Sequence, residues 1–248
     1  MKATYLLLNL AVISIPLAFS WKGRFRFVDR WRAFFPACLL VLAAFVIWDI
    51  PFAAAGVWGF DKRYLLGPSL FGLPMEEWLF FVCIPYACVF TYHALEELRF
   101  RPVGDSVVPG LNLGVAILCV LLLIACWGQL YTTLTALLTG VFAAWLWFRR
   151  PAWAAGFWTA YLVLLLPFVL TNGVLTGVRF WEYPLLNVNP DAITNHVVWY
   201  NNAENLGIRF LSIPLDDFLY AFLLIGTNIG LMELFGSRSG GWTRRLAA

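Results

Sequence analysis

The sequence predicts an all-α polytopic membrane protein with about seven transmembrane helices in a 3+1+3 parallel internal repeat. Hydrophobic residues make up 62% of the 248 residues, and charged residues only 12%. Several apolar runs reach the ~20 residues that a helix needs to cross a bilayer. An acidic motif also occurs twice, at a constant offset of 140 residues. The segments between the apolar runs are too short for a soluble domain.

Seven apolar runs are long enough to be membrane spans, each bounded to within ~2–4 residues. The first run ends in Ala18-Phe19-Ser20, which loosely resembles a signal-peptidase site, but a lone Lys2 makes a poor basic start for a signal peptide. We therefore expect the first run to be a true span. The seven runs lie near residues 3–20, 34–58, 74–95, 109–127, 130–148, 154–175 and 212–235.

Basic residues are distributed unevenly between the two sets of predicted loops. Cytoplasmic loops carry an excess of Lys and Arg, which predicts an N-terminus outside and a C-terminus inside a bacterial inner membrane. The net charge of +3 reflects this asymmetry, so we expect a lipid membrane as partner and no nucleic acid. The predicted cytoplasmic set is Lys22, Arg24, Arg26, Arg30, Arg32, Arg99, Arg101, Arg149, Arg150, Arg238, Arg244 and Arg245, against Lys2, Lys62, Arg63, Arg179 and Arg209 outside.

The five cysteines all lie within apolar runs and lack the CxxC or His spacing of a metal site. We expect buried, structural thiols and no bound metal. The residues are Cys38, Cys83, Cys88, Cys119 and Cys126.

The acidic motif indicates a duplicated chain. Residues 66–80 align without a gap with residues 206–220, sharing L-G, five residues, an aliphatic residue and then P-x-acid-acid-aromatic-L-aromatic. Asp49, near the end of the second span, has a counterpart in Asn172 near the end of the sixth. A repeat of three spans places both acidic pairs at one depth, facing each other across a pseudo-twofold axis. We expect a first repeat at residues 1–108, a linker helix at 109–129 and a second repeat at 130–248.

The two acidic pairs, Glu76-Glu77 and Asp216-Asp217, each follow a proline at the start of a predicted span. In a soluble helix, such acids accept orphan backbone N–H groups and complement the positive helix end. Here the acids lie within a turn of hydrocarbon, where an ionised carboxylate costs roughly 2.5–3.5 kcal/mol at the helix centre and less near its end. Four acids at one depth therefore favour a function over simple capping.

Four carboxyl groups in a poorly solvated volume cannot all ionise at pH 7, because desolvation and like-charge repulsion both disfavour the anions. At least one is expected to keep its proton, which puts a proton donor beside an acceptor, as general acid–base catalysis requires. Adjacent helical positions point about 100° apart, so we expect one acid of each pair to face a common cavity. The sequence leaves open which one.

Aromatic residues, 18% of the chain, flank both acidic pairs. Aromatic belts at membrane interfaces account for most Trp and Tyr in such a chain. The remainder can stabilise a carbocation through their ring faces, by ~2 kcal/mol or more each where desolvated. An acid that protonates an alkene in an aromatic cavity open to the bilayer favours polyene cyclisation. The candidate substrate-binding residues are Asp49, Asn172, Trp78, Phe80 and Tyr220.

The repeated motif resembles that of a known family, the membrane-integral lycopene cyclases, and the resemblance covers nearly the whole chain. The family occurs as two small subunits in some actinobacteria, as fused chains in other bacteria and archaea, and as one domain of fungal bifunctional cyclase–phytoene synthases. The resemblance implies an intramolecular lyase or isomerase of the lycopene β-cyclase type. Its markers are Pro74-Met75-Glu76-Glu77, Pro214-Leu215-Asp216-Asp217, Asn172-Gly173-Val174-Leu175-Thr176-Gly177 and Trp199-Tyr200-Asn201.

The reaction that the resemblance implies is redox-neutral and starts with a proton. Protonation at C2 of the acyclic ψ end group of lycopene, or of a related carotenoid, leaves a cation at C1. Attack by the C5–C6 double bond closes the ring and moves the charge to C5. Loss of a proton from C6 gives a β ring, from C4 an ε ring and from the C5 methyl group a γ ring. The sequence leaves open the ring type and whether one or both ends of the substrate react.

The second motif departs from the family pattern, because Asp216 stands where the pattern has Glu. This shortens the reach of the carboxylate by one methylene, so we expect the acid in the Glu76-Glu77 pair. Glu76, Glu77, Asp216 and Asp217 are all candidate catalytic residues. The resemblance implies no flavin, and the sequence has no G-x-G-x-x-G after a strand. We expect no cofactor and leave the oligomeric state open.

A proton-coupled transporter of small solutes is the alternative function. Small carriers also have a 3+1+3 helix repeat, and acids within a membrane can couple protons to transport. Against this reading, the acids lie at helix starts, and the spans contain few Asn, Gln, Ser or Thr residues for a polar solute. We therefore favour the cyclase.

Overall fold

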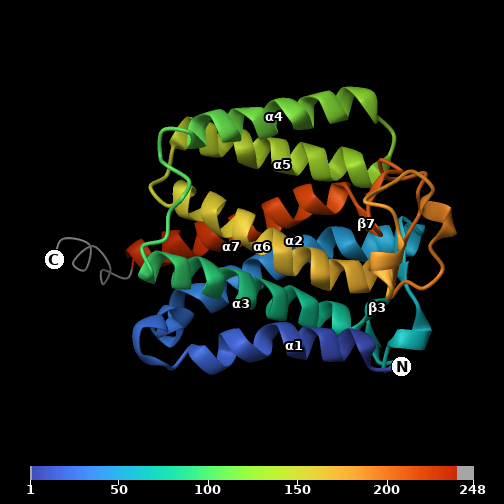
Figure 1. Cartoon of the computed structure of the whole chain (residues 1–248), viewed down its shortest axis with the longest axis horizontal. Helices are drawn as coiled ribbons and strands as arrows, with labels where there is room; N and C mark the ends of the chain where they lie inside the picture. The colour runs from blue at the N-terminus through green and yellow to red at the C-terminus, as the bar shows by residue number, and fades with distance from the viewer. Residues whose placement is uncertain (1, 239–248) are drawn as a thin grey trace.

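The computed structural model describes residues 2–238, which form a bundle of roughly parallel and antiparallel helices (Figure 1). Within these residues, six helices are long and apolar enough to cross a membrane. The chain is therefore an all-helical, polytopic integral membrane protein. The helices are α1 Thr4–Phe19, α2 Trp31–Ala55, α3 Met75–Glu97, α4 Val108–Ala125, α5 Leu130–Arg149, α6 Ala154–Thr176 and α7 Asp216–Arg238.

The helix bounds agree with the predicted spans to within four residues at every end. Helix α1 is apolar but has only 16 residues, which reach about 24 Å against a hydrocarbon core of about 30 Å. Its predicted crossing of the bilayer therefore stays a prediction. The described residues do not include Arg244 and Arg245, which were counted in predicting the orientation. They also do not include residues 1 and 248, the outer bounds of the two predicted repeats.

The packing of the helices has a two-fold pattern. Helix α1 packs on α3 as α5 packs on α7, and α2 packs on α7 as α6 packs on α3. Helices α3 and α7 contact each other, and α4 packs mainly against α5 at one edge of the bundle (Figure 1). Each of these contacts made by α1, α2 or α3 therefore has a counterpart made by the equivalent helix among α5, α6 and α7. The division into two three-helix repeats and a linker is our proposal for this pattern.

Two short hairpins lead into the acidic helices. Strand β2 Ser69–Leu70 pairs with β3 Leu73–Pro74 directly before α3, and β6 Arg209–Phe210 pairs with β7 Ile213–Pro214 just before α7. The two hairpins have the same register at the predicted offset of 140 residues. Each therefore delivers its acidic pair to the first turn of the following helix in the same way.

The hairpin turns use the same backbone conformation in both copies. Phe71 and Leu211, the equivalent turn residues, both have left-handed backbones with φ of 51° and 58°. Gly67 and Gly207 also have positive φ, which glycine adopts without the steric cost that a Cβ brings. The matched turns show that the local structure of the motif repeats together with its sequence.

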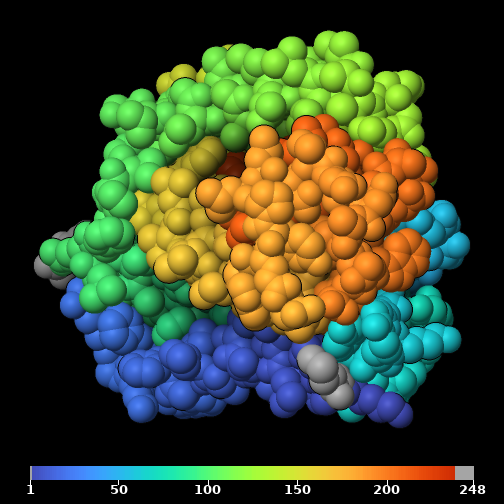
Figure 2. All heavy atoms as spheres, turned by 45° about the vertical axis from the view of Figure 1, so that its right-hand side comes forward, coloured from blue at the N-terminus to red at the C-terminus, as the bar shows by residue number. Residues whose placement is uncertain are grey.

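The remaining strands lie at the hairpin end of the bundle, where one strand pair joins the loops of the two halves. Strand β1 Trp58–Phe60, after α2, pairs antiparallel with β5 Val198–Tyr200, after α6. Strand β4 Leu186–Asn187 pairs with β6. The loop after α6 gathers over this end of the molecule, in orange in Figure 2. Short 3-10 turns complete the chain at Gly23–Phe25, Phe27–Arg30, Lys62–Tyr64, Phe180–Glu182 and Pro190–Ala192.

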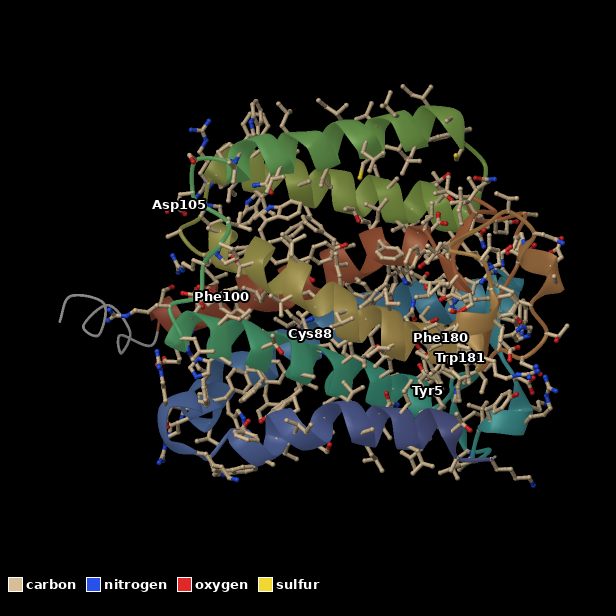
Figure 3. The ribbon with its side chains drawn as sticks, viewed as in Figure 1. Tyr5, Cys88, Phe100, Asp105, Phe180 and Trp181 are labelled. Carbon is tan, nitrogen blue, oxygen red and sulfur yellow. The ribbon has the colours of Figure 1, made fainter. Side chains whose placement is uncertain are left out.

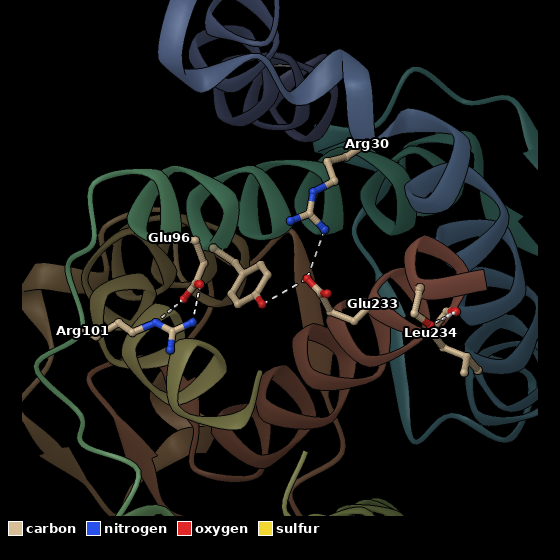
Figure 4. Close-up of polar contacts among 7 residues, drawn as sticks. Arg30, Glu96, Arg101, Glu233 and Leu234 are labelled. Carbon is tan, nitrogen blue, oxygen red and sulfur yellow. Dashed lines mark hydrogen bonds and ion pairs between the residues drawn. The ribbon is translucent and has the colours of Figure 1, made fainter. Parts of the chain in front are cut away.

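The opposite end of the bundle is joined by a polar network (Figure 4). Buried Arg30 donates a hydrogen bond of 3.2 Å to Glu233 on α7, and the Tyr92 hydroxyl donates one of 3.1 Å to the same oxygen. Nearby, Arg101 forms an ion pair with Glu96 on α3. This network fixes the end of α7 relative to α3 and to the segment before α2.

Candidate functional site

A cavity of about 370 Å³ lies inside the bundle, within the size range typical of ligand sites. We call it the central cavity. Its lining includes Tyr5, near the hairpin end of the bundle, and Cys88, near the middle (Figure 3). Along α3 the lining runs from Glu77 to Thr91, which corresponds to roughly 20 Å of helix. The cavity is therefore elongated along the bundle and begins at the level of the acidic motifs.

One acid of each pair lines the central cavity. Glu77, from α3, and Asp217, from α7, belong to the lining and are 8% and 4% exposed. The two residues occupy equivalent positions in the repeated motif. The cavity thus brings together one carboxyl group from each half of the chain.

The other acid of each pair holds the loop before its hairpin. Glu76 Oε1 accepts a hydrogen bond of 2.7 Å from the backbone N–H of Leu66, and Asp216 Oδ2 accepts one of 3.2 Å from the N–H of Leu206. Neither Glu76 nor Asp216 is part of the cavity lining. These contacts are capping interactions of the kind that carboxylates form with backbone donors. The pairs therefore separate into a cavity residue and a loop residue.

Glu77 has few hydrogen-bond donors around its carboxyl group. Within the described residues, its side-chain donor is the Tyr5 hydroxyl, at 2.5 Å. Asp49 on α2 is close enough to act on Glu77 electrostatically. Asp49 accepts a hydrogen bond of 2.6 Å from Trp58 Nε1 through one oxygen, whereas its other oxygen is buried without a partner among the described residues. Two carboxyl groups therefore share this side of the cavity with two donors.

Asp217 is surrounded by donors. Its Oδ1 accepts a hydrogen bond of 2.6 Å from the Tyr131 hydroxyl. Its Oδ2 accepts bonds of 2.7 Å from Asn172 Nδ2 and 3.2 Å from the Tyr200 hydroxyl. Three donors on one carboxylate stabilise its negative charge. Glu77 and Asp217 are equivalent in sequence but lie in different electrostatic environments.

The predicted substrate-binding residues divide in a similar way. Asp49, Asn172, Phe80 and Tyr220 line the central cavity with Glu77 and Asp217. Trp78 does not, because its indole N–H points to the hairpin and donates a hydrogen bond of 3.3 Å to the carbonyl of Leu70. The structure thus leaves Glu76, Asp216 and Trp78 outside the cavity lining.

Sequence reasoning missed three residues that donate to the carboxyl groups of the central cavity, namely Tyr5, Tyr131 and Trp58. Tyr5 and Tyr131 both lie in the first turn of their helices, and each donates to the cavity acid of its own half. Aligning the first helices of the two halves would have found this pair. Trp58 lies on a short strand in a loop, where no periodic pattern marks it, and it pairs with Tyr200, which belongs to the Trp199-Tyr200-Asn201 marker.

The walls away from the acids are apolar, and the cavity reaches the molecular surface between α1 and α6. Ile84 and Leu164 form part of the inner wall. Ala11 and Ile15 on α1 and Pro167 on α6 also line the cavity, although all three are exposed. Ile15 is 67% exposed. Because α1 and α6 are both apolar helices, the opening lies in an apolar part of the molecular surface.

The other half of the bundle has aromatic side chains at the corresponding place. The correspondence of Asp49 with Asn172 pairs Trp48 with Thr171 and Phe45 with Phe168. Trp48 and Phe45 are buried, and their ring centroids lie 5.5 Å and 5.2 Å from that of Tyr220. On this side of the bundle the aromatic rings occupy the space that corresponds to the open cavity between α1 and α6. The two halves therefore differ in shape.

No group of three or more His, Cys, Asp or Glu residues within residues 2–238 is arranged to hold a metal ion.

Comparisons with known proteins identify a family for the chain. A family model described as lycopene cyclase matches residues 2–95 and 128–235, which leaves out α4 and the loop before it. A bifunctional lycopene cyclase/phytoene synthase of Leptosphaeria maculans is 30% identical over 76 residues, covering 31% of this chain and 13% of the fungal protein. The protein of the same name from Pyrenophora tritici-repentis is 30% identical over 64 residues, or 26% and 11% of the two chains. The aligned parts thus span a small fraction of these curated relatives. No solved structure matches the chain.

Proposed function

We propose, from the premise that this chain belongs to the lycopene cyclase family, that it closes rings at the ψ end groups of lycopene or a related carotenoid. The reaction is redox-neutral and starts with a proton, which makes the enzyme an intramolecular lyase or isomerase of the β-cyclase type. The observation that carries this proposal is that Glu77 and Asp217, one from each half, line the same elongated apolar cavity. A proton donor and a proton acceptor are the two groups that the reaction needs.

Glu77 is the general acid in this mechanism. Its carboxyl group is buried, lies near the second carboxyl group of Asp49 and receives one side-chain hydrogen bond, from Tyr5. Desolvation and a like-charged neighbour both favour the neutral acid. Glu77 can therefore hold a proton at neutral pH and deliver it to C2 of the end group. Of the two candidate acids, Glu76 and Glu77, we therefore assign the role of general acid to Glu77.

Asp217 is the general base. Its three donors stabilise the carboxylate, and the guanidinium of Arg209 adds a positive charge nearby. A carboxylate that stays ionised can accept the proton that the C5 cation loses from a neighbouring carbon. Proton transfer from Glu77 to C2 and from the ring to Asp217 leaves the substrate with unchanged mass and the pair of acids with one proton in total.

The aromatic residues of the cavity stabilise the intermediate cation. Phe80 and Tyr220 line the cavity at positions equivalent in the two halves, each three residues after the cavity acid. A ring face near a desolvated cation contributes ~2 kcal/mol or more. Trp58 and Tyr200 add further rings at the end of the cavity that holds the acids. These rings lower the barrier to the C1 and C5 cations relative to an aliphatic pocket.

The shape of the cavity fits a substrate that arrives from the bilayer. The acids lie at one end, and the apolar slot runs from them along α3 toward the middle of the bundle. A ψ end group at the acids would leave the polyene chain in the slot, with access through the opening between α1 and α6. We place the N-terminus outside and the C-terminus inside a bacterial inner membrane, on the distribution of basic residues in the loops.

The test is expression of the full chain in a bacterial host that accumulates lycopene, followed by pigment chromatography and mass spectrometry. We expect new cyclic pigments of the same mass as lycopene, with the isomer reporting the ring type. A Glu77→Gln, Asp217→Asn double variant expressed at the same level is the matched control. Identical pigment profiles for the wild type and the empty host, with protein present in the membrane, would refute the proposed function.

A further inference from the structure

A second cavity lies directly outside the acid end of the central cavity. This loop cavity has a volume of about 280 Å³ and is walled by the loop that follows α6. Its polar lining residues include Asp191, His196, Asn202 and Arg209. Val198 and Tyr200 line both cavities. Of these two residues, Tyr200 has a hydroxyl group that can transfer a proton.

Tyr200 stands between the two cavities with a defined partner on each side. Toward the central cavity, its hydroxyl donates a hydrogen bond of 3.2 Å to Asp217 Oδ2. Toward the loop cavity, the guanidinium of Arg209 lies 5.5 Å from the centre of its ring. Arg209 is itself held by hydrogen bonds of 2.8 Å to the Ser212 carbonyl and 2.7 Å to Asn202 Oδ1. The order from the loops inward is therefore Arg209, Tyr200, Asp217.

The groups around Tyr200 suit a neutral proton carrier. Burial and the nearby Asp217 carboxylate raise the pKa of Tyr200 well above its usual value, so the phenol keeps its proton at neutral pH. Burial lowers the pKa of His196, which favours the neutral form of this imidazole in the loop cavity. A phenol that does not ionise passes a proton by accepting one on its oxygen while giving up its own.

We propose that the loop cavity is the proton port of the site and that Tyr200 exchanges protons between its water and Asp217. The inference rests on the proposed function, because cyclisation loads Asp217 with one proton per ring. Tyr200 now donates to Asp217. Once Asp217 is protonated, its O–H donates to the Tyr200 oxygen instead, and the phenol hydrogen turns toward the loop cavity and passes to water there. The reverse step returns a solvent proton to Asp217, and water that enters the central cavity between turnovers carries it to the Glu77 carboxylate. Each ring thus uses one proton at Glu77 and yields one at Asp217.

The proposal separates two sources of the proton that enters the next ring. With the port open, the proton taken from one ring exchanges with solvent before it is reused at C2. With the port closed, the same proton is returned internally to Glu77 and enters the next substrate. The isotopic content of the product therefore reports on Tyr200 independently of the rate.

The experiment uses the full chain in lipid vesicles that contain unlabelled lycopene, with cyclisation carried out in D2O. We expect the wild type, after its first turnovers, to place close to one deuterium at C2 of each new ring. In Tyr200→Phe, the deuterium content per ring should fall by half or more at the same number of turnovers, because hydrogen from the substrate is recycled. Mass spectrometry of the products gives this content directly.

Tyr131→Phe is the matched control. Tyr131 also donates to Asp217, but it is not part of the lining of the loop cavity. Its loss should leave the deuterium content at the wild-type level even where turnover is slower. Ile193→Phe provides a second test. Ile193 lines the loop cavity but not the central cavity, and a phenyl ring at this position would exclude water from the loop cavity. This variant should reproduce the deuterium loss of Tyr200→Phe, and it replaces that variant if the latter does not fold.

The outcomes distinguish this inference from the proposed function. If the wild type forms no rings, the cyclase proposal fails. If rings form and Tyr200→Phe and Ile193→Phe carry as much deuterium as the wild type, the cyclase proposal stands and the proton port is refuted. Equal deuterium loss in Tyr131→Phe and Tyr200→Phe also refutes it, because the effect would then follow from Asp217 alone.

Discussion

Glu77 and Asp217 occupy the same position in two segments 140 residues apart, yet in the described structure Glu77 accepts one side-chain hydrogen bond and Asp217 accepts three. One cause lies on the neighbouring helices. Asn172 donates to Asp217, whereas its counterpart Asp49 offers Glu77 a second carboxyl group. The two equivalent carboxyl groups thus lie in different environments, which is the basis of our proposal that Glu77 is the acid and Asp217 the base.

The first prediction separates the two acids of the first half. Glu77→Gln keeps the size of the side chain but removes the transferable proton, so turnover should fall ~10²–10⁴-fold. Glu76→Gln should keep near wild-type turnover, because the amide oxygen can still accept the Leu66 N–H, and stability should fall by at most ~0.5–2 kcal/mol. Rates are measured with both variants at equal levels in the membrane. Equal losses of turnover in the two variants would contradict the division into a cavity acid and a loop acid.

The second prediction concerns the base in the second half. Asp217→Asn should lower turnover ~10²–10⁴-fold, as the loss of a general base does. Asp217→Glu keeps a base but moves it by about 1.5 Å, the length of one C–C bond. Because the carbon that loses its proton decides the ring type, Asp217→Glu should remain active and change the ratio of β, ε and γ rings. Asp216→Glu is the control and should leave the ratio unchanged, since Asp216 does not line the cavity. Chromatography of the pigments measures all three variants.

Much of the fold could be predicted because its signals are local. The length of each apolar run sets the helix bounds, and the repeated P-x-acid-acid motif indicates the equivalent hairpins at residues 69–74 and 209–214. The presence of one cavity acid and one loop acid per pair follows from the 100° between adjacent helical positions. These features need no information about how the helices pack.

The remaining features of the site depend on contacts between distant segments. That Glu77 rather than Glu76 faces the cavity depends on the rotation of α3, which the packing of α1 and α6 determines. Tyr5 reaches Glu77 over a separation of 72 residues, and Tyr131 reaches Asp217 over 86. Trp78 looked like a cavity residue because it follows the acids, but its side chain points to the hairpin. Adjacency in sequence is a poor guide to facing direction on a helix.

The third prediction concerns stability at the end of the bundle away from the acids. Glu233→Leu removes the carboxylate beside Arg30, whose side chain is 4% exposed, and leaves a buried charge without this partner. Losing a hydrogen bond to a charged group destabilises a protein by ~1.5–3 kcal/mol. Asp29→Asn is the control, because it breaks an exposed ion pair in which the side chains of Arg26 and Asp29 are 62% and 57% exposed. It should lower the free energy of unfolding by no more than ~1 kcal/mol. Thermal unfolding of the purified variants measures both. A similar Tm for Glu233→Leu and the wild type would contradict the structural role of this pair.

The last prediction tests whether substrate reaches the acids through the opening between α1 and α6. Ile15 lines the central cavity and is 67% exposed, so it stands where the cavity meets the lipid. An indole ring in place of the isoleucine side chain should obstruct the opening without touching Glu77 or Asp217. We expect Ile15→Trp to lower the rate of cyclisation about tenfold or more, because every substrate molecule would have to enter through the obstructed opening.

The matched control lies on the equivalent helix of the other half. Val141 on α5 corresponds to Ile15 when Tyr131 is aligned with Tyr5, and it is 62% exposed but does not line the central cavity. Val141→Trp therefore adds the same ring to the lipid-facing surface at the same level of the bundle, and its rate should stay within about twofold of wild type, since exposed substitutions away from a site have small effects. Rates are compared in vesicles over a range of lycopene contents. Equal rates for Ile15→Trp, Val141→Trp and the wild type would mean that the substrate reaches the acids by another path.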